Sequence, residues 1–281
     1  MDKRSFEYTD SRLETGAAAL YELNVVAGTD GFSFLAADPT GTILSLKSWH
    51  FDPYEDPAQG PSSAILRILD EEPLLNAVFS HVRYAVFGTE TTLVPRRLFN
   101  HDELPAYFRL LLPPGNFEFG HSALPDFDCY LAYAVEQELA SVLRQRFPAA
   151  QSLHLAAPVL SRALQIIGFD STGVMANLRH GVVQIVALER GNLLFYNTFK
   201  FDTASDLLYF VLLVYDQCRL NPDQMPLYLA GELLPDSEIY KVLYRYIRHL
   251  NFVGPPLNYF WPHDVAAPPD HLFFDLYSLK F

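Results

Sequence analysis

The chain has 281 residues, and its 33 Asp and Glu against 20 Lys and Arg give a formal net charge of −13. Half of the residues are hydrophobic and only 19% are charged, which excludes an intrinsically disordered chain. The acidic balance argues against nucleic acid as a partner, because binding a phosphate backbone needs a basic surface. With two cysteines, the chain is neither a disulfide scaffold nor a four-cysteine zinc protein.

The N-terminal segment and the longest apolar run both bear on the compartment. Charges at Asp2, Lys3 and Arg4 interrupt the first residues, and no apolar core of signal-peptide type follows them. The longest apolar run extends from Leu207 to Tyr215, nine residues, whereas a membrane span needs about 20. We therefore predict no membrane span and a cytoplasmic location.

Two stretches of the chain, 21–52 and 171–202, share a pattern at an offset of 150 residues. In this register Gly31 meets Gly181, Gly41 meets Gly191, and Phe51-Asp52 meets Phe201-Asp202. The runs between the glycines are β-branched and aromatic, which is typical of strands, while glycine is typical of tight turns. Each stretch predicts a three-stranded antiparallel meander, and we interpret the pair as an internal duplication.

Helical and strand patterns alternate along the rest of the chain. The first half predicts helices within 62–80, a strand at 84–87, a helix at 102–111, a strand at 117–121, a strand at 129–134, a helix at 135–147, a strand at 152–156 and a helix at 158–167. The second half predicts a helix at 204–219, a strand at 227–230 and a helix with apolar residues from Ile239 to Leu250. Such alternation predicts mixed sheets with helices on their faces.

The offset predicts two related domains. The first covers residues 1–170 and carries an extension, and the second covers 171–281. The second ends in a proline-rich segment, 254–269, followed by the sequence LFFDLYSLKF, for which strand and helix both remain open.

Two copies of a unit of meander, helix, strand and helix resemble the actin-like ATPase superfamily, and the likeness extends over 21–250. The branch that it resembles most is the PilM and FtsA type. The run TTLVPRRLF at 91–99 and the length also resemble an uncharacterised bacterial family with this fold. The resemblance implies an α/β, duplicated actin-like ATPase (ribonuclease H-like) fold, in which two related domains have mixed sheets flanked by helices.

The resemblance also implies a nucleotide site. In active members the first turn of each meander cradles the ATP phosphates, where a strand ends in Asp and small residues follow, so that backbone N–H groups reach the phosphate. In the first turn Asn24 stands near the Asp position, with Gly28 and Thr29 after it.

In the second turn Asn177 replaces the Asp, and Arg179 and His180 replace small residues before Gly181. Two interpretations of Arg179 and His180 remain open: a direct grip on a phosphate, or surface positions of a hairpin turn. The nucleoside-side motif usually ends in two glycines, but here Gly231 is followed by Glu232, whose carboxylate would repel an anion.

Both expected Asp positions are therefore neutral, and removing a catalytic carboxylate typically costs orders of magnitude in rate. We predict a non-catalytic interaction or scaffold module that has lost nucleotide turnover; the alternative is an ATP-binding switch or ATPase. We expect no cofactor, with ATP as the alternative, and we expect a protein partner. We expect no metal, because His249, His263 and His271 lack metal-binding spacing. The oligomeric state is left open.

Aromatic side chains near the C-terminus have two interpretations. The residues concerned are Tyr240, Tyr244, Tyr246, Tyr259, Phe260 and Trp261. They either fill the core or leave an exposed patch of the kind that marks a protein interface.

Overall fold

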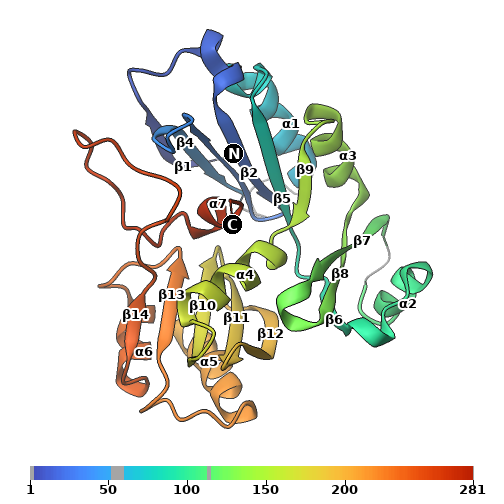
Figure 1. Cartoon of the computed structure of the whole chain (residues 1–281), viewed down its shortest axis with the longest axis vertical. Helices are drawn as coiled ribbons and strands as arrows, with labels where there is room; N and C mark the ends of the chain where they lie inside the picture. The colour runs from blue at the N-terminus through green and yellow to red at the C-terminus, as the bar shows by residue number, and fades with distance from the viewer. Residues whose placement is uncertain (1–2, 52–59, 113–114, 281) are drawn as a thin grey trace.

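Three sheets form the framework of the molecule (Figure 1), and the computed structural model describes residues 3–51, 60–112 and 115–280. The first sheet has the order β1 (Lys3–Thr9), β4 (Ile43–His50), β3 (Gly31–Ala37), β2 (Glu22–Gly28), β5 (His81–Phe87) and β9 (Gln151–His154). The second has the order β12 (Asn192–Lys200), β11 (Val182–Glu189), β10 (Thr172–Arg179), β13 (Leu227–Gly231) and β14 (Leu250–Phe252). A small third sheet has the order β6 (Thr91–Pro95), β8 (Cys129–Glu136) and β7 (Phe117–Leu124).

The first two sheets share one strand plan. In each, three consecutive strands form an antiparallel meander (β2–β3–β4 and β10–β11–β12), and two later strands run parallel to the first strand of the meander. The two meanders that the sequence pattern predicts are therefore present. We call the first sheet with its helices the first lobe, and the second sheet with its helices the second lobe. That one lobe arose by duplication of the other stays a prediction.

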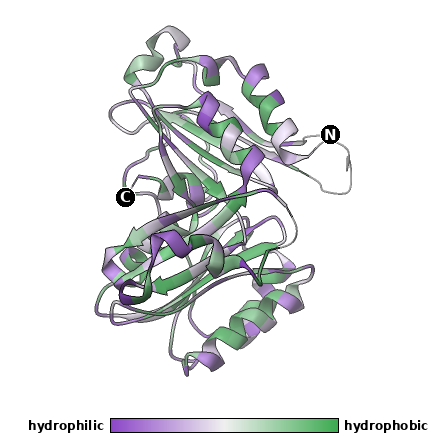
Figure 2. Ribbon diagram, turned by 90° about the vertical axis from the view of Figure 1, so that its right-hand side faces the viewer, coloured by the Kyte–Doolittle hydropathy of each residue, from purple (hydrophilic) through white to green (hydrophobic). Residues whose placement is uncertain are grey.

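The central strands are buried on both faces, which explains their continuous apolar sequences. Every residue from Leu23 to Gly28 in β2 and from Gly173 to Leu178 in β10 is buried. The edge strand β12 instead mixes exposed and half-buried residues. The hydropathy colouring of Figure 2 shows the same distribution, with hydrophobic residues along the strands of both lobes.

Helices cover the outer faces of both lobes and fill the space between them (Figure 1). On the first lobe α1 (Pro61–Glu71) packs on α3 (Gln137–Arg146), and on the second α5 (Ala204–Gln217) packs on α6 (Glu238–Tyr246). Between the lobes α4 (Ala156–Ile167) packs on α7 (Phe274–Ser278). The remaining elements are short: η1 (Thr15–Leu20), η2 (Pro73–Asn76), η3 (Arg96–Leu98), η4 (His101–Glu103), α2 (Leu104–Phe108) and η5 (Pro125–Phe127).

The C-terminal segment, whose conformation the sequence leaves open, forms α7 and joins the lobes. Phe274 and Leu276 are buried in one apolar cluster with residues of both large sheets. Upstream, the backbone N–H of Ile43 donates to the carbonyl of Phe260 at 2.9 Å, which ties the same segment to β4. The predicted domain boundary at 170/171 stays a prediction, while the C-terminal residues contact both lobes.

Three local expectations differ from the structure. The predicted helix through Leu250 ends at Tyr246, because Leu250 starts β14 and pairs with β13. The predicted helix at 102–111 is shorter, with α2 limited to Leu104–Phe108. Two strands have no counterpart among the predicted elements: β1, which pairs with β4 at the sheet edge, and β6, which pairs with β8. Asp52 of the repeat lies outside the described residues.

Within the described ranges, no helix is both long and apolar enough to cross a membrane.

A fully buried histidine ends β9. The His154 ring stacks on Tyr133 with 4.9 Å between the ring centroids, and its Nδ1 accepts a hydrogen bond from the N–H of Ala156 at 3.2 Å. Its Nε2 has no hydrogen-bond partner among the described residues. Burial lowers the pKa of His154 from 6.5 to about 3, more than the nearby backbone of Gly88 raises it.

This histidine should make stability depend on pH. Between pH 6.5 and 3 the unfolded chain binds a proton at this residue that the folded chain excludes. As the pH falls through this range, the free energy of unfolding should therefore decrease by about 1.4 kcal/mol for each pH unit. Replacing His154 with Leu should remove that contribution. Urea unfolding of both proteins at pH 7, 6 and 5 measures the difference in slope, and parallel curves would contradict the expectation.

Candidate functional site

Two hairpin turns from different lobes meet at the centre of the molecule. One connects β2 to β3 through Gly28 to Gly31, and the other connects β10 to β11 through His180 and Gly181. Helix α7 lies beside both turns, and Gly231 at the end of β13 completes the group. These are the turns that the sequence pattern predicts as the nucleotide site.

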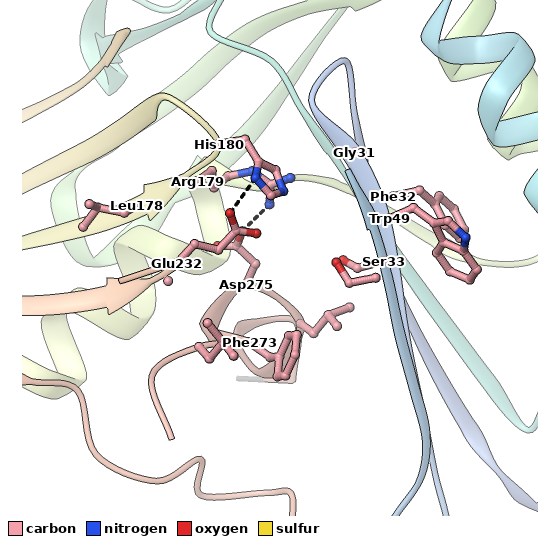
Figure 3. A pocket seen from close by; sticks show the side chains of 14 residues that line it. Gly31, Phe32, Ser33, Trp49, Leu178, Arg179, His180, Glu232, Phe273 and Asp275 are labelled. Carbon is pink, nitrogen blue, oxygen red and sulfur yellow. Dashed lines mark hydrogen bonds and ion pairs between the residues drawn. The ribbon is translucent and has the colours of Figure 1, made fainter. Parts of the chain in front are cut away.

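Arg179 bridges the two turns. Its Nε donates to Asp30 Oδ2 at 2.7 Å and its Nη2 donates to Asp30 Oδ1 at 3.1 Å, a bidentate arrangement across the lobes. Its Nη1 donates to Asp275 on α7. The guanidinium also lies 4.6 Å from the centroid of the Phe87 ring. We call Arg179, Asp30 and Asp275 the interlobe clamp (Figure 3 shows the contact with Asp275).

The clamp is nearly closed off from solvent, with side-chain exposures of 10% for Arg179, 10% for Asp30 and 13% for Asp275. Burial lowers the pKa of Arg179, but the negative charges of Asp30 and Asp275 raise it by more. The pKa of Arg179 is therefore above its ordinary value. Burial raises the pKa of Asp275, against the opposing effects of Arg179 and Asn177. One guanidinium thus forms ion pairs with carboxylates from two different parts of the chain.

The second turn residue, His180, makes a separate set of contacts. Its Nδ1 lies 2.7 Å from Glu232 Oε2, and Figure 3 shows this pair beside the clamp. Its ring contacts the His50 ring of β4 at an interplanar angle of 42°, with 3.7 Å between the centroids. Burial and the neighbouring His180 lower the pKa of His50. Glu232, predicted to repel a ligand anion, is therefore paired with an internal group.

The two asparagines support α7 from opposite lobes. Asn177 Nδ2 donates to Asp275 Oδ1 at 2.7 Å and to Gln184 Oε1 at 3.0 Å. Asn24 Nδ2 donates to the Tyr259 hydroxyl at 2.7 Å and to the carbonyl of Leu276 at 2.9 Å. Both asparagines are buried, and the Oδ1 atom of each has no hydrogen-bond partner in the described part of the chain.

The glycines have steric reasons for their places. Gly231 has φ +82°, and a Cβ there would lie 2.0 Å from the carbonyl oxygen of Leu178. At Gly28 a Cβ would lie 2.5 Å from Asp30 Oδ1. Backbone packing and the clamp therefore require these glycines whether or not a phosphate binds.

Two cavities adjoin the turns. The inner cavity, of about 30 Å³, lies between the turns and α7 and is lined by Arg179, His180, Glu232 and Asp275 among others. Its volume is about that of one water molecule. The outer cavity, of about 870 Å³, lies on the other side of the turns, between both lobes and the third sheet. Thr29, His180 and Gly181 reach it, so it is the part of the junction with room for a ligand.

The structure brings the predicted site residues to one region but assigns them different surroundings. Arg179, His180, Gly231 and Glu232 surround the inner cavity, whereas Asn24 lies deep in β2 and faces Leu276 and Tyr259. That these residues bind a cofactor stays a prediction.

Sequence reasoning missed the two acids of the clamp. Asp30 lies inside the turn that the pattern singled out, and it supplies a carboxylate there although the Asp position itself is neutral. Asp275 lies in the C-terminal segment, where no local signal marks it. Among the described residues, no three His, Cys, Asp or Glu side chains gather in a way that could hold a metal ion.

Comparison with solved structures identifies the fold of the protein. The chain is similar to a Bacteroides thetaiotaomicron protein with actin-like ATPase fold and unknown function, with a TM-score of 0.75 and 19% identity over 86% of this chain and 94% of that chain. The chain is also similar to the PilM–PilN type IV pilus biogenesis complex, with a TM-score of 0.49 and 13% identity over 87% of this chain and 91% of that chain. Its similarity to the ethanolamine utilization protein EutJ from Carboxydothermus hydrogenoformans has a TM-score of 0.48 and 11% identity, over 92% of this chain and 88% of that chain.

The chain therefore has the actin-like ATPase fold, which confirms the predicted α/β fold class. It belongs to the family described as "Protein of unknown function (DUF3822)", which matches residues 10–250, so the predicted resemblance to an uncharacterised family with this fold is confirmed as well. No curated protein matches the chain.

Replacing Arg179 with Met should leave Asp30 and Asp275 buried without a counter-charge. Breaking a buried ion pair from one side typically costs about 3–5 kcal/mol, and we expect a loss of that order in the free energy of unfolding. The triple variant Arg179→Met, Asp30→Asn, Asp275→Asn should recover part of the loss. Urea unfolding compares the three proteins, and a single variant as stable as the wild type would show that the clamp is dispensable.

Replacing Gly231 with Ala should destabilise the chain, because of the positive φ and the close Leu178 carbonyl. Strain of this kind costs about 1–3 kcal/mol, and the steric overlap adds to it. The matched control is Gly16→Ala, where no atom would lie within 4 Å of the new Cβ. Thermal unfolding should separate the two variants, and equal midpoints would refute the steric argument.

Proposed function

We propose that the chain is a non-catalytic interaction module built on the actin-like ATPase fold, in which side chains occupy the place between the two turns. The observation that carries this proposal is the interlobe clamp. Arg179 reaches from one turn to Asp30 of the other, and the space left beside it is about 30 Å³. A ligand pocket usually has about 300–1,000 Å³, so a phosphate chain has no room between the turns unless the clamp opens.

Charge supports the same conclusion. An incoming phosphate would have to compete with two carboxylates that already form ion pairs with Arg179, namely Asp30, at 2.7 Å, and Asp275. Glu232 stands on the same side and would add repulsion. Exchanging two covalently tethered partners for one mobile anion is unfavourable, because the tethered carboxylates are already oriented.

Exposed aromatic residues support the interaction part of the proposal. Tyr244 and Tyr246 of α6 are 65% and 54% exposed, and Phe260 is 56% exposed. Tyrosine and phenylalanine are enriched at protein interfaces. Tyr259 of the same group is instead buried. A protein partner and a cytoplasmic location belong to this proposal.

The second candidate function is an ATP-binding switch or ATPase. The feature that favours it is the small-residue turn of the first lobe, Gly28-Thr29, which borders the outer cavity through Thr29. In this case Arg179 would leave Asp30 and Asp275 and bind a phosphate, and the lobes would move relative to each other.

Calorimetric titration with ATP and Mg²⁺, together with a phosphate-release assay, separates the two functions. We expect no heat of binding at millimolar ATP and no phosphate release. The matched variant combines Arg179→Ser and His180→Gly with Asp30→Asn and Asp275→Asn, which restores small residues in the second turn and leaves no buried carboxylate without its counter-charge. Binding by this variant alone would support the view that the two side chains block the site. Micromolar binding and turnover by the wild type would refute the proposal.

A further inference from the structure

The outer cavity combines aromatic rings with carboxylates. Its walls come from both lobes and from the third sheet, at the edge where the parallel strands β2 and β5 end. Ligands of α/β proteins commonly bind beyond the carboxyl ends of parallel strands. At about 870 Å³ the cavity has the size of a small-molecule site. What it can bind follows from its lining.

Four phenylalanines line the cavity: Phe51, Phe87, Phe117 and Phe201. They come from four different segments of the chain. The face of an aromatic ring attracts a cation. Phe87 already shows this in the structure, because the Arg179 guanidinium lies 4.6 Å from its ring centroid.

Carboxylates outnumber cations on the same walls. Glu90, Glu136 and Asp202 line the cavity, and none of them forms an ion pair with another described residue. The fourth carboxylate, Asp30, forms an ion pair with Arg179. The cation on the lining is Lys200.

The two histidines on the lining are already engaged with neighbouring groups. His50 has a lowered pKa, and it faces His180, Glu232 and the backbone of Asp30. His180 is already paired with Glu232. Among the described lining residues, three carboxylates without an ion pair against one lysine give the cavity a net negative charge.

We propose that the outer cavity is a binding site for a small organic ammonium ion that carries an apolar group. The carboxylates would bind the positive charge, and the phenylalanine rings would contact the apolar group and the face of the cation. This proposal rests on the proposed function, since it requires that no polyphosphate binds between the two lobes. A polyphosphate anion would meet the same carboxylates as a repulsive wall.

Three probes of similar size test the charge preference: 2-phenylethylammonium, neutral 2-phenylethanol and anionic phenylacetate. Each is titrated against the full-length chain at pH 7 and low salt by ligand-observed NMR. We expect the ammonium probe to bind about tenfold more tightly than the alcohol, which corresponds to roughly 1.4 kcal/mol, and phenylacetate to bind weakest. Equal or tighter binding of phenylacetate would overturn the proposal.

Matched variants test the location. The triple variant Glu90→Gln, Glu136→Gln, Asp202→Asn keeps the shape of the cavity and removes three charges, and we expect it to lose the preference for the ammonium probe. The control Glu189→Gln, Asp216→Asn, Asp223→Asn removes three charges from exposed positions that do not line the cavity, and it should keep the preference. Loss of the preference in both triple variants would mean that net charge alone attracts the probe, and would overturn the proposal.

A second variant tests the rings without changing the charge. Phe117 is half-buried at the start of β7, so Leu is a tolerable replacement there. Phe117→Leu should weaken the ammonium probe more than the alcohol, because the cation loses a ring face as well as apolar contact. An equal loss of affinity for both probes would show that the ring of Phe117 does not contact the cation, and would contradict this part of the proposal. Failure of these titrations is separate from failure of the proposed function, which the ATP titration decides.

Discussion

One buried guanidinium holds the centre of this molecule. Arg179 extends from the second lobe to Asp30 in the first and to Asp275 in the helix that lies between them. In a low-dielectric setting none of the three charges is stable alone, because burying an unpaired charge costs several kcal/mol. The position of the two hairpin turns, the docking of α7 and the closure of the inner cavity therefore depend on the same three side chains.

This constraint changes the meaning of the glycine-rich turns. In a nucleotide site, small residues let backbone N–H groups approach a phosphate. Here Gly28 accommodates the Asp30 carboxylate, and Gly231 accommodates the carbonyl of Leu178. The sequence signature of the fold can thus persist for reasons of internal packing. A pattern of small residues in these turns indicates the fold, and the neighbouring polar side chains decide what the turn contacts.

The sequence predicted those parts of the fold that local patterns encode. The meanders follow from alternating apolar strands between turn glycines, and α4 and α5 follow from long apolar periodicities. Strands β1 and β14 escaped because short strands owe their conformation to pairing with distant partners, β4 and β13. The conformation of the final segment, which forms helix α7, remained open for the same reason, since its apolar residues are buried against both lobes.

The candidate site shows a similar division. Arg179 and His180 attracted notice because they depart from the small residues expected in a turn. Their partners did not, since Asp30 lies 149 residues and Asp275 lies 96 residues from Arg179, and a lone acid in a loop carries no pattern. Long-range ion pairs are set by the fold as a whole, so single-sequence reasoning finds one end of the pair at most.

The clamp also has a consequence for the outer cavity. Arg179 forms an ion pair with Asp30 on the cavity wall, so the remaining negative charge comes from Glu90, Glu136 and Asp202. Because the clamp fixes the two lobes together, the wall residues from each lobe keep their separation without a ligand. A cavity that is already shaped spares its ligand the cost of ordering loops, and this preorganisation raises affinity for whichever charge suits the walls. The same interaction that removes room for a phosphate between the turns thus favours selective binding beside them.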